Sequence, residues 1–548
     1  TIDLYWTNKN IMRKFLTLSL FCAIVSVNCT AQDGDNIYDD TYIHIVEINS
    51  IEPLSYNDFH TELYNSHQAV YWDYSGEKPY FHAVVAIDGN IVDSVGLRYK
   101  GISSFEAAPG IEKYALKIDL NEFVSGQSYD GIKKINLNNN IQDVSCMRAK
   151  LASEIMHRMG IAAPRVAHAK VYVNGIYRGI YSLVEQIDKT FVRNNYAADS
   201  TGYLHKAWGL PIGYETPTWG GQDTSQLSLS AWSPLKTKQS TNNYQPLREF
   251  IDACNNATDL EFENDVNGMF DLETFIEQQA INMILSDRDH YCGAHWNFYM
   301  YLNPEDNKWY MIPWDYDLSF GTQIPWTHID NPADPNLYNQ TSDLFDQDRC
   351  LLNRRMFDSP SLKNRYHEAL CEVINYGMDS LWINNRIDEI RDLIGTEVEN
   401  DPFFHNISSY NTYLNDTLVI SGTGNWLLDG VSNQGIREYI NQRFQEVRQS
   451  LLDNGFDCNS ATIELDEDGF SNSIINIYPN PAIDIINIDV SSNLKYEATI
   501  FDLQGSVIIS TTNQSVIDIQ PFPQGVYLIK IIDLDTGQKV IKKIIKGK

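Results

Sequence analysis

The sequence predicts an α+β domain of roughly 400 residues followed by a small all-β sandwich domain. Three observations support this fold class. The chain has 548 residues, which exceeds the size at which one hydrophobic core keeps growing, so two or more domains are expected. Residues 40–455 mix helical periodicity with strand alternation and contain no internal repeat. Residues 474–548, in contrast, consist of short Ile- and Val-rich runs separated by turn residues.

The first 31 residues have the features of a secretion signal. Met12-Arg13-Lys14 supplies a positive start, residues 15–27 form an apolar run, and Cys29-Thr30-Ala31 offers small residues before Gln32. The run is too short to span a membrane comfortably. We therefore expect residues 1–31 to be a removable signal segment whose true start is Met12. A lipoprotein anchored through Cys29 is the alternative, although the residues before Cys29 fit a lipoprotein motif poorly.

The composition excludes several classes of function. The formal net charge is -31 at pH 7, and 43% of the residues are hydrophobic. Such an acidic balance repels nucleic acid and anionic membrane surfaces, so neither is expected as a partner. It suits a secreted protein that meets divalent cations or basic partners. After the signal segment, no stretch is long and apolar enough to predict a transmembrane segment.

Cysteine usage agrees with an oxidising compartment. Of the eight cysteines, six remain after removal of the signal segment: Cys146, Cys254, Cys292, Cys350, Cys371 and Cys458. Disulfides are therefore permitted, but the sequence leaves their pairing open. No CxxC pair occurs, so a structural zinc site is not expected.

Several helices and hairpins can be placed within residues 40–455. Asp143 is positioned to cap a helix over about residues 144–159, and Asp271 to cap a second helix that runs to about Leu285. Asn174-Gly175 lies between two strand-like runs and predicts a tight hairpin. The remaining expected elements are a hairpin around residues 303–307 and helices over residues 361–396 and 434–453.

Residues 456–473 are acidic and lack helix or strand periodicity, which predicts a linker. After it, three short runs at residues 485–490, 498–501 and 526–529 are expected to be strands of the small antiparallel sandwich.

Two aspartates after a predicted strand are the first candidates for chemistry. In Trp314-Asp315-Tyr316-Asp317 the carboxylates alternate, so in an extended segment both share one face. One or two carboxylates together with substrate phosphates are the ligands that Mg²⁺ commonly uses. An Asp-x-Asp pair is a weak signal by itself, because two surface aspartates are common in an acidic protein.

Further candidates lie upstream. Asp287 and Asp289 follow the second predicted helix, and Asn297 comes at the start of the next strand. These residue types suit phosphoryl transfer, in which an Asp that accepts a hydroxyl proton and an Asn that holds metal recur. Lys117 lies in a run with strand alternation and is suited to hold phosphate as a point charge, although a solvent-facing lysine is the simpler reading. The turn at residues 100–104 is suited to cover phosphates.

Together and in this order, these pieces resemble the CotH (spore coat protein H-like) kinase family over about residues 90–325. The resemblance is densest in blocks at Leu97–Ser104 with Ala115–Lys117, at Lys134–Asn138 through Met147–Ala152 and Tyr172–Glu185, and at Asp289, Asn297–Tyr301 and Ile312–Gly321. It implies that residues 40–455 form an atypical protein-kinase-like two-lobed domain with a helical C-terminal part. It also implies use of ATP and Mg²⁺, or Mn²⁺, to phosphorylate Ser or Thr of secreted proteins.

The resemblance also implies roles for individual residues. Lys117 would hold the α- and β-phosphates, Asp289 would be the catalytic base, and Asn297 and Asp315 would ligate metal with support from Asp317. Cofactor contacts are further expected from Ser103 in the covering turn, from Glu185 near the adenine, and from the helix that bears Arg148, Lys150 and Glu154, which could supply a partner for Lys117. Two departures are visible: seven residues separate Asp289 from Asn297, which makes Asp287 a fallback base, and Ile102 replaces a small polar residue.

Residues 474–548 resemble the C-terminal sorting domain of type IX secretion substrates. The matching residues are Tyr478-Pro479-Asn480-Pro481, Gly525-Val526-Tyr527-Leu528-Ile529 and the basic tail Lys542–Lys546. The resemblance implies recognition by the type IX secretion machinery, translocation across an outer membrane, and then release or surface attachment. An ordinary β-sandwich binding module is the alternative.

Two other functions remain open from the residues. A non-catalytic surface adhesin or glycan-binding protein on a degenerate fold is suggested by Trp208, Trp219 and Trp232, which lie among Gly, Thr and Ser. A metal-dependent nucleotide-sugar transferase could also use Asp315 and Asp317, but no other residue supports it.

Overall fold

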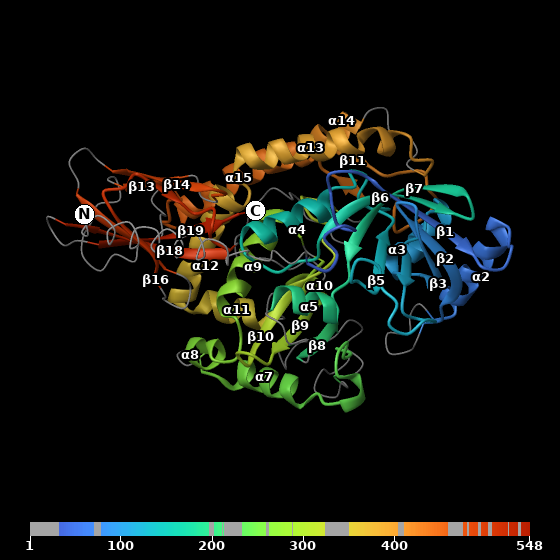
Figure 1. The fold of residues 1–548 in the computed structure, drawn as a ribbon, viewed down its shortest axis with the longest axis horizontal. Coiled ribbons are helices and arrows are strands. Elements are labelled where there is room, and N and C mark those ends of the chain that lie inside the picture. Colours follow the sequence, from blue (N-terminus) through green and yellow to red (C-terminus); the bar gives the residue numbers. More distant parts are fainter. Residues whose placement is uncertain are drawn as a thin grey trace, which may run out of the picture.

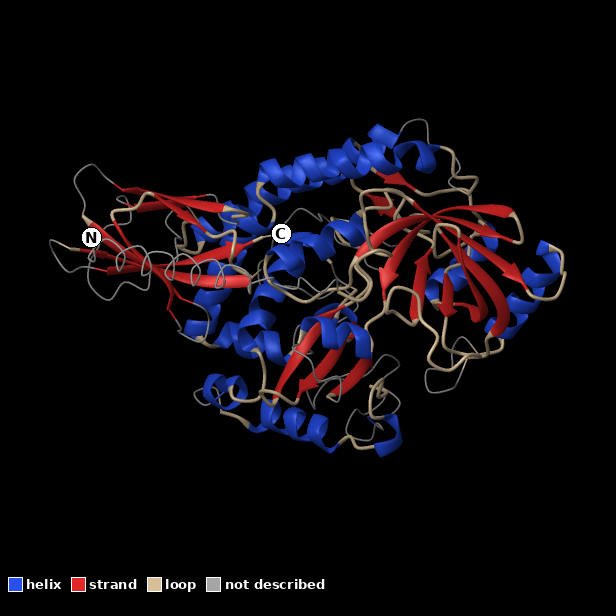
Figure 2. Cartoon of the chain, in the orientation of Figure 1, coloured by secondary structure: helices blue, strands red, loops and turns tan. Residues whose placement is uncertain are grey.

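The computed structural model confirms the α+β class of the large region (Figures 1 and 2). It describes residues 32–70, 78–196, 202–210, 233–258, 262–287, 289–323, 350–403, 410–458, 475–478, 482–490, 495–501, 507–523, 525–534 and 539–547, together with Ile212 and Leu229. The expected signal segment, most of the expected linker, and Trp219 and Trp232 lie outside these residues.

The N-terminal part of the large region is a closed seven-stranded barrel, in the order β1-β2-β3-β4-β5-β7-β6. β1 and β6 pair in parallel and close it, whereas the other neighbours are antiparallel. Ile, Val, Leu and Tyr side chains fill its core. The strands are β1 (His44–Ser50), β2 (Phe81–Ile87), β3 (Asn90–Tyr99), β4 (Leu116–Asp119), β5 (Lys134–Asn138), β6 (Val166–Val173) and β7 (Ile176–Glu185).

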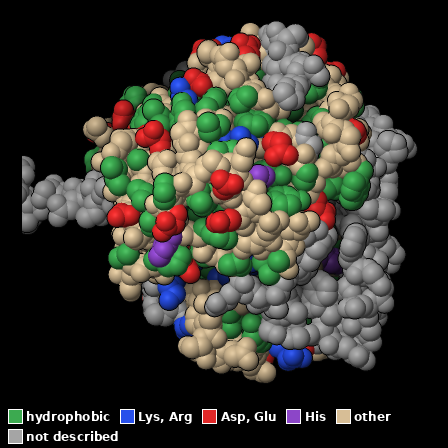
Figure 3. Space-filling view, turned by 90° about the vertical axis from the view of Figure 1, so that its right-hand side faces the viewer, with side chains coloured by type: hydrophobic (Ala, Val, Ile, Leu, Met, Phe, Trp, Pro, Cys, Tyr) green, Lys and Arg blue, Asp and Glu red, His purple; other side chains and the backbone are tan. Residues whose placement is uncertain are grey.

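The expected hairpin at Asn174-Gly175 is confirmed and joins β6 to β7. Both turn residues have positive φ angles, 46° and 75°, which is the backbone that a two-residue hairpin turn requires. Two short helices, α2 (Tyr56–Gln68) and α3 (Ser103–Ala107), accompany the barrel. On the face of the molecule that Figure 3 shows, acidic side chains are scattered among apolar ones and are more frequent than basic ones.

The helix expected from residue 144 begins later, as α4 (Arg148–Arg158). Cys146 has a φ of 55°, and this left-handed residue cannot belong to a right-handed helix. Asp143 is therefore not the N-cap, although its Oδ2 still accepts the Arg148 backbone N–H at 3.0 Å.

The second part of the large region contains a three-stranded sheet and several helices. The sheet has the order β10-β9-β8, with β8 (Tyr203–Trp208), β9 (Trp296–Asn303) and β10 (Lys308–Pro313), and so confirms the hairpin around residues 303–307. The helix capped by Asp271 is confirmed as α9 (Leu272–Leu285). The other helices before the C-terminal bundle are α5 (Lys189–Asn195), α7 (Gln245–Asn256), α8 (Phe262–Asn267), α10 (Tyr291–Ala294) and α11 (Leu351–Asp358).

The helix expected over residues 361–396 is broken into two. α12 (Pro360–Glu372) continues into a π-helical turn over residues 373–377, and α13 (Ser380–Glu399) starts afresh with Asp379 as its N-cap. α14 (Tyr410–Asn415), β11 (Leu418–Val419) and β12 (Ser432–Asn433) follow, and α15 (Ile436–Asp453) confirms the last expected helix.

A buried ion pair attaches the C-terminal helices to the barrel. The Lys113 Nζ donates to Asp401 Oδ2 at 2.7 Å, and both side chains are fully buried. The Ile180 backbone N–H also donates to Asp401, at 2.8 Å. Gly179 leaves room for this carboxylate, because a Cβ at that position would lie only 2.2 Å from Asp401 Oδ2.

The C-terminal region contains two antiparallel sheets that share one apolar core, as a sandwich requires. The first has the order β13-β14-β17 and the second β16-β15-β18-β19. The strands are β13 (Ile475–Tyr478), β14 (Ile485–Val490), β15 (Tyr496–Phe501), β16 (Val507–Thr512), β17 (Val516–Asp518), β18 (Gly525–Asp533) and β19 (Lys539–Lys546), and they include the three that the sequence predicts. Throughout the described parts of the chain, every helix is too short or too polar to cross a bilayer.

Candidate functional site

Asp289 is the best-anchored carboxylate of the candidate site. It lies between α9 and α10, and the Trp296 indole N–H donates to its Oδ1 at 2.7 Å. The Asn297 side-chain nitrogen donates both to Asp289 Oδ2, at 2.9 Å, and to its backbone carbonyl, at 2.8 Å. Because both amide protons are used in this way, the Asn297 oxygen is left as the atom that can bind a cation.

Asp287 lies behind Asp289 and is only 2% exposed. Its Oδ1 accepts the Asp289 backbone N–H at 2.9 Å, whereas its buried Oδ2 has no hydrogen-bond partner among the described residues. Burial and the nearby Asp289 raise the pKa of Asp287 well above its usual value. A buried carboxylate oxygen without a donor is costly, so this position favours protonation or a bound cation.

The strand end that carries Asp315 is joined to the same place. Asp315 follows β10 with a φ of 68°, and the Trp314 backbone N–H donates to the Asn297 carbonyl at 3.2 Å. Asp317 is half-buried, and burial followed by repulsion from Asp315 raises its pKa well above the usual value. Asp315 therefore lies among like charges on the same side of the site.

The pKa of Asp289 is raised to about 7, mainly by burial. The hydrogen bonds from Trp296 and Asn297 oppose this rise, and the charge of Asp315 adds to it. A carboxyl group that titrates near neutral pH is suited to accept a proton from a substrate hydroxyl.

The donor set fits magnesium only together with a ligand that brings its own oxygens. Within the described ranges, no group of three or more His, Cys, Asp or Glu side chains is arranged to hold a metal ion. Asp315 and the Asn297 oxygen, with the unpartnered oxygen of Asp287 behind them, supply few protein ligands. Mg²⁺ is commonly bound by only a few protein ligands when phosphate oxygens complete its coordination.

The basic side of the candidate site comes from the barrel. The Lys117 Nζ, on β4, donates to Gln186 Oε1 at 2.5 Å. Burial lowers the pKa of Lys117 well below its usual value, and the cations Arg98, Lys134, Lys100 and Lys206 lower it further. No described carboxylate forms an ion pair with Lys117, so an anionic ligand would relieve this repulsion.

Lys100, at the end of β3, comes close to the carboxylate side. Its Nζ donates to Asn138 Oδ1 at 2.6 Å and lies 5.6 Å from the centre of the Trp314 ring. Burial lowers the pKa of Lys100 to about 8, and the charges of Asp315 and Asp317 oppose that shift. Lys100 of the barrel and the carboxylates of Asp315 and Asp317 beyond β10 therefore act on one another electrostatically.

Helix α4 does not supply the expected partner for Lys117. Arg148 is fully buried, and its guanidinium binds Asp143 at 3.0 Å and the Ser319 carbonyl at 3.1 Å. Lys150 and Glu154 pair with each other at 2.9 Å, and the outer partners of this network are Asp40 and Arg386. Arg148 therefore supports the turn that follows Asp317 rather than lying beside Lys117.

The structure also gives the positions of Glu185 and Ser103, the two other expected cofactor contacts. Glu185, at the end of β7, forms a two-oxygen ion pair with Arg165 at 2.8 and 3.0 Å, and its neighbour Gln186 is the residue that contacts Lys117. Ser103 is exposed on the first turn of α3, directly after the covering turn, where Gly101 has a φ of 88°. Gln186 and Lys206 were missed by sequence reasoning, because nothing in the local pattern separates them from ordinary polar residues.

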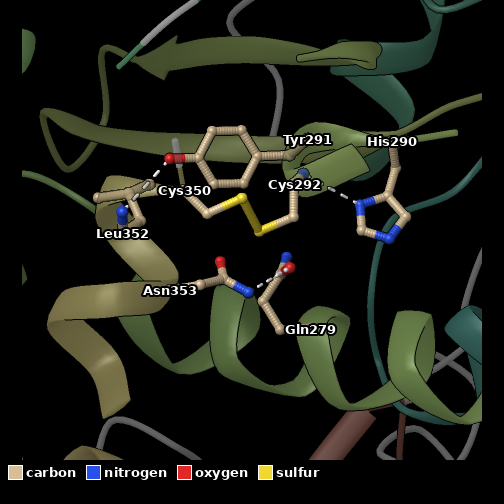
Figure 4. Close-up of a disulfide and its surroundings, with 7 residues drawn as sticks. All are labelled: Gln279, His290, Tyr291, Cys292, Cys350, Leu352 and Asn353. Atoms are coloured by element: carbon tan, nitrogen blue, oxygen red, sulfur yellow. Dashed lines mark hydrogen bonds between the residues drawn. A yellow bond between two sulfur atoms is a disulfide. The ribbon is translucent and has the colours of Figure 1, made fainter. Parts of the chain in front are cut away.

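A disulfide fixes the segment just after Asp289. Cys292, in α10, bonds to Cys350 at the start of α11 (Figure 4). The Leu352 backbone N–H donates to the Tyr291 hydroxyl at 3.3 Å, and the Cys292 N–H to His290 Nδ1 at 3.4 Å. A second disulfide joins Cys371 to Cys458, while Cys146 and Cys254 are free and buried.

Comparison with protein families identifies the large region. The family model of the CotH kinase protein matches residues 97–448, which include every candidate residue described above. The chain belongs to the CotH kinase protein family. A second family model, the secretion system C-terminal sorting domain, matches residues 476–547. This sorting domain indicates that the chain is handled by the type IX secretion machinery, secreted and attached at the surface.

Named relatives are distant. Inner spore coat protein H of Bacillus subtilis is 25% identical over 37% of this chain and 54% of its own length. Invasin CotH2 of Rhizopus delemar is 22% identical over 47% of this chain and 44% of its own length. The chain thus spans about half the length of these curated relatives. A solved protein from Bacteroides vulgatus with an immunoglobulin-like β-sandwich is 18% identical and covers 16% of this chain and 99% of its own, at a TM-score of 0.13.

Proposed function

We propose that this CotH family member is a secreted atypical protein kinase that transfers the γ-phosphate of ATP to Ser or Thr of extracellular or surface proteins, with Mg²⁺ or Mn²⁺. The proposal takes the barrel as one lobe and the β8–β10 sheet with its helices as the other. One observation carries it: Lys100 of the barrel, which lies near Lys117, is within electrostatic reach of the partly buried carboxylates Asp315 and Asp317 beyond β10. The lysines repel one another and the carboxylates repel one another, and a metal-bound polyphosphate would neutralise both sets of charges.

The side chains divide the work of binding. Lys117 would hold phosphate as a point charge, kept in place by Gln186. Asp315 and the Asn297 oxygen would ligate the metal, and Asp317 would support them. When bound, the metal–nucleotide complex supplies the phosphoryl group and an electrophilic phosphorus. Arg148 acts indirectly, because its contact with the Ser319 carbonyl holds the turn after Asp317.

Asp289 is the proposed base. The Trp296 indole and the Asn297 amide hold its two carboxylate oxygens, so the group is oriented before a substrate arrives. Its pKa of about 7 lets it accept the proton of a Ser or Thr hydroxyl near neutral pH. Asp287 reinforces the position of this loop by accepting the Asp289 backbone N–H.

A non-catalytic adhesin is the second candidate, because Rhizopus relatives carry the name invasin. The proposed aromatic platform provides little further support, since Trp219 and Trp232 lie outside the described residues. Trp208 instead contacts Lys206, whose Nζ lies 4.5 Å from its ring centre.

Phosphate transfer separates the two functions. The full chain is incubated with γ-labelled ATP, Mg²⁺ or Mn²⁺, and casein or the chain itself, beside an Asp315→Ala variant and an Asp265→Ala control on the exposed side of α8. Transfer that survives in the control and disappears in Asp315→Ala supports the kinase. If the wild-type chain shows neither transfer nor thermal stabilisation by nucleotide, the kinase is rejected and the adhesin is favoured.

A further inference from the structure

Lys206 is a cation of the β8–β10 sheet that the proposed catalytic residues do not include. Its Nζ lies 5.6 Å from the centre of the Trp314 ring, the same ring that Lys100 of the barrel approaches at 5.6 Å. Trp208 and Tyr299 line the other sides of this ammonium group, at 4.5 and 5.8 Å. Two lysines from different parts of the fold therefore meet at one tryptophan, directly before Asp315.

The surroundings of Lys206 leave its charge poorly balanced. No described carboxylate forms an ion pair with it, and its charged neighbours include the cations Lys236 and Lys100 as well as the single anion Asp315. Burial and these cations lower the pKa of Lys206 to about 7. Aromatic faces attract an ammonium group only modestly, whereas an anion would stabilise both lysines at once.

We propose that Lys100 and Lys206 form a two-lysine clamp for the terminal phosphates of the nucleotide, one lysine from each side of the site. This inference rests on the proposed function and deepens it, because it assigns a phosphate-number preference to the site. Lys117 contacts Gln186 at the end of the barrel, whereas the clamp lies beside Trp314 and the candidate metal ligand Asp315. Asp315 would hold the metal that accompanies the terminal phosphates, so the clamp beside it would face the terminal side of the nucleotide.

The clamp makes affinity depend on the number of phosphates. A nucleoside triphosphate reaches both lysines, while a monophosphate reaches only the part of the site near Lys117. The bound triphosphate would also join the barrel to the β8–β10 sheet, because each side contributes one of the two cations.

The test measures binding of ATP, ADP and AMP to the full chain by calorimetry with Mg²⁺. Variants are Lys206→Ala, Lys206→Arg and the control Lys238→Ala, a lysine that lies over the Tyr203 ring at 4.6 Å in the same region but away from Trp314. Far-ultraviolet circular dichroism and the melting temperature without ligand verify that each variant is folded.

We expect Lys206→Ala to weaken ATP binding by about 10- to 100-fold, the range for loss of a charged hydrogen bond, and to leave AMP binding unchanged. Lys206→Arg should restore most of the ATP affinity, and Lys238→Ala should match the wild type. Equal affinity of wild-type chain and a folded Lys206→Ala for ATP, or equal weakening for ATP and AMP, would overturn the clamp while leaving the proposed kinase intact. If the wild-type chain binds none of the three nucleotides, the proposed function fails and the clamp with it.

Discussion

Replacing Asp289 with Asn should make the nucleotide-free protein more stable at neutral pH while it abolishes phosphate transfer. The folded protein holds this carboxyl at a pKa of about 7, against 3.8 for an unburied aspartate. Between these values the folded state binds more protons than the unfolded state, so its stability falls as the pH rises. Above pH 7 the ionised Asp289 carboxylate lowers the stability of the fold by its full amount, and the uncharged amide of Asn avoids this loss.

The magnitude follows from the pKa shift. A shift of about 3 units, at about 1.4 kcal/mol for each unit, sets an upper limit of about 4 kcal/mol. Asp289 is partly exposed, which reduces the penalty, and an Asn side chain has one acceptor oxygen for the two donors Trp296 and Asn297, which costs about 1 kcal/mol. We therefore expect a net gain of about 1–2 kcal/mol at pH 8, or about 1–2 °C in melting temperature for a domain of this size.

Thermal unfolding of the full chain without nucleotide or metal, at pH 4.5 and pH 8, measures this effect. The melting temperature of Asp289→Asn should exceed that of the wild type at pH 8 and should equal or fall below it at pH 4.5, where the wild-type carboxyl is protonated in the fold. The exposed control Asp265→Asn should show no such change with pH. A variant that is destabilised equally at both pH values would refute the idea that the fold strains this carboxylate.

Three further predictions address the fold and its export. Gly179→Ala should lower the free energy of unfolding by more than about 3 kcal/mol, because the new Cβ would lie 2.2 Å from Asp401 Oδ2 at a φ of 91°. The control Gly175→Ala, with a φ of 75° and nothing within 4 Å, should lower it by about 1 kcal/mol. Equal losses in chemical unfolding would contradict the role of Asp401. Replacing the cysteines of either disulfide by serines should destabilise the chain by about 3–4 kcal/mol. At a temperature where both variants are folded, only loss of Cys292–Cys350 should lower kcat for phosphate transfer, since this disulfide fixes the segment after Asp289. An unchanged kcat would show that α10 holds its position without the bond. Deleting residues 476–547 should leave the protein inside the cell envelope, as fractionation would show, and normal secretion would contradict the sorting role.

Local patterns predicted much of the secondary structure. Asp271 and Asn174-Gly175 determine a helix start and a hairpin through their own side chains and backbone preferences, and the structure confirms both. The barrel could not be predicted in this way, because its closure depends on parallel pairing of β1 with β6, which are more than 100 residues apart. Likewise, nothing in the local sequence signals the left-handed Cys146 that shortens α4.

The candidate site likewise contains residues that local motifs predict and residues whose surroundings depend on distant parts of the chain. Asp289 lies between α9 and α10, Asn297 at the start of β9 and Asp315 just after β10, so short local motifs single them out as candidates. The surroundings of Lys117 depend on residues from separate elements, and its contact with Gln186 rather than an acidic residue of α4 was not predictable from spacing. Lys206 belongs to an ordinary strand pattern, and only its convergence with Lys100 on Trp314 distinguishes it.

The central claim is that these side chains transfer phosphate. The most direct measurement is mass spectrometry of casein and of the chain itself after incubation with ATP and Mg²⁺, with release of ADP followed in parallel. We expect new phosphoserine or phosphothreonine with the wild-type chain, and a loss of about 100-fold or more in the rate with a folded Asp289→Asn. Failure of the wild-type chain to phosphorylate any acceptor, or an undiminished rate in Asp289→Asn, would contradict the claim.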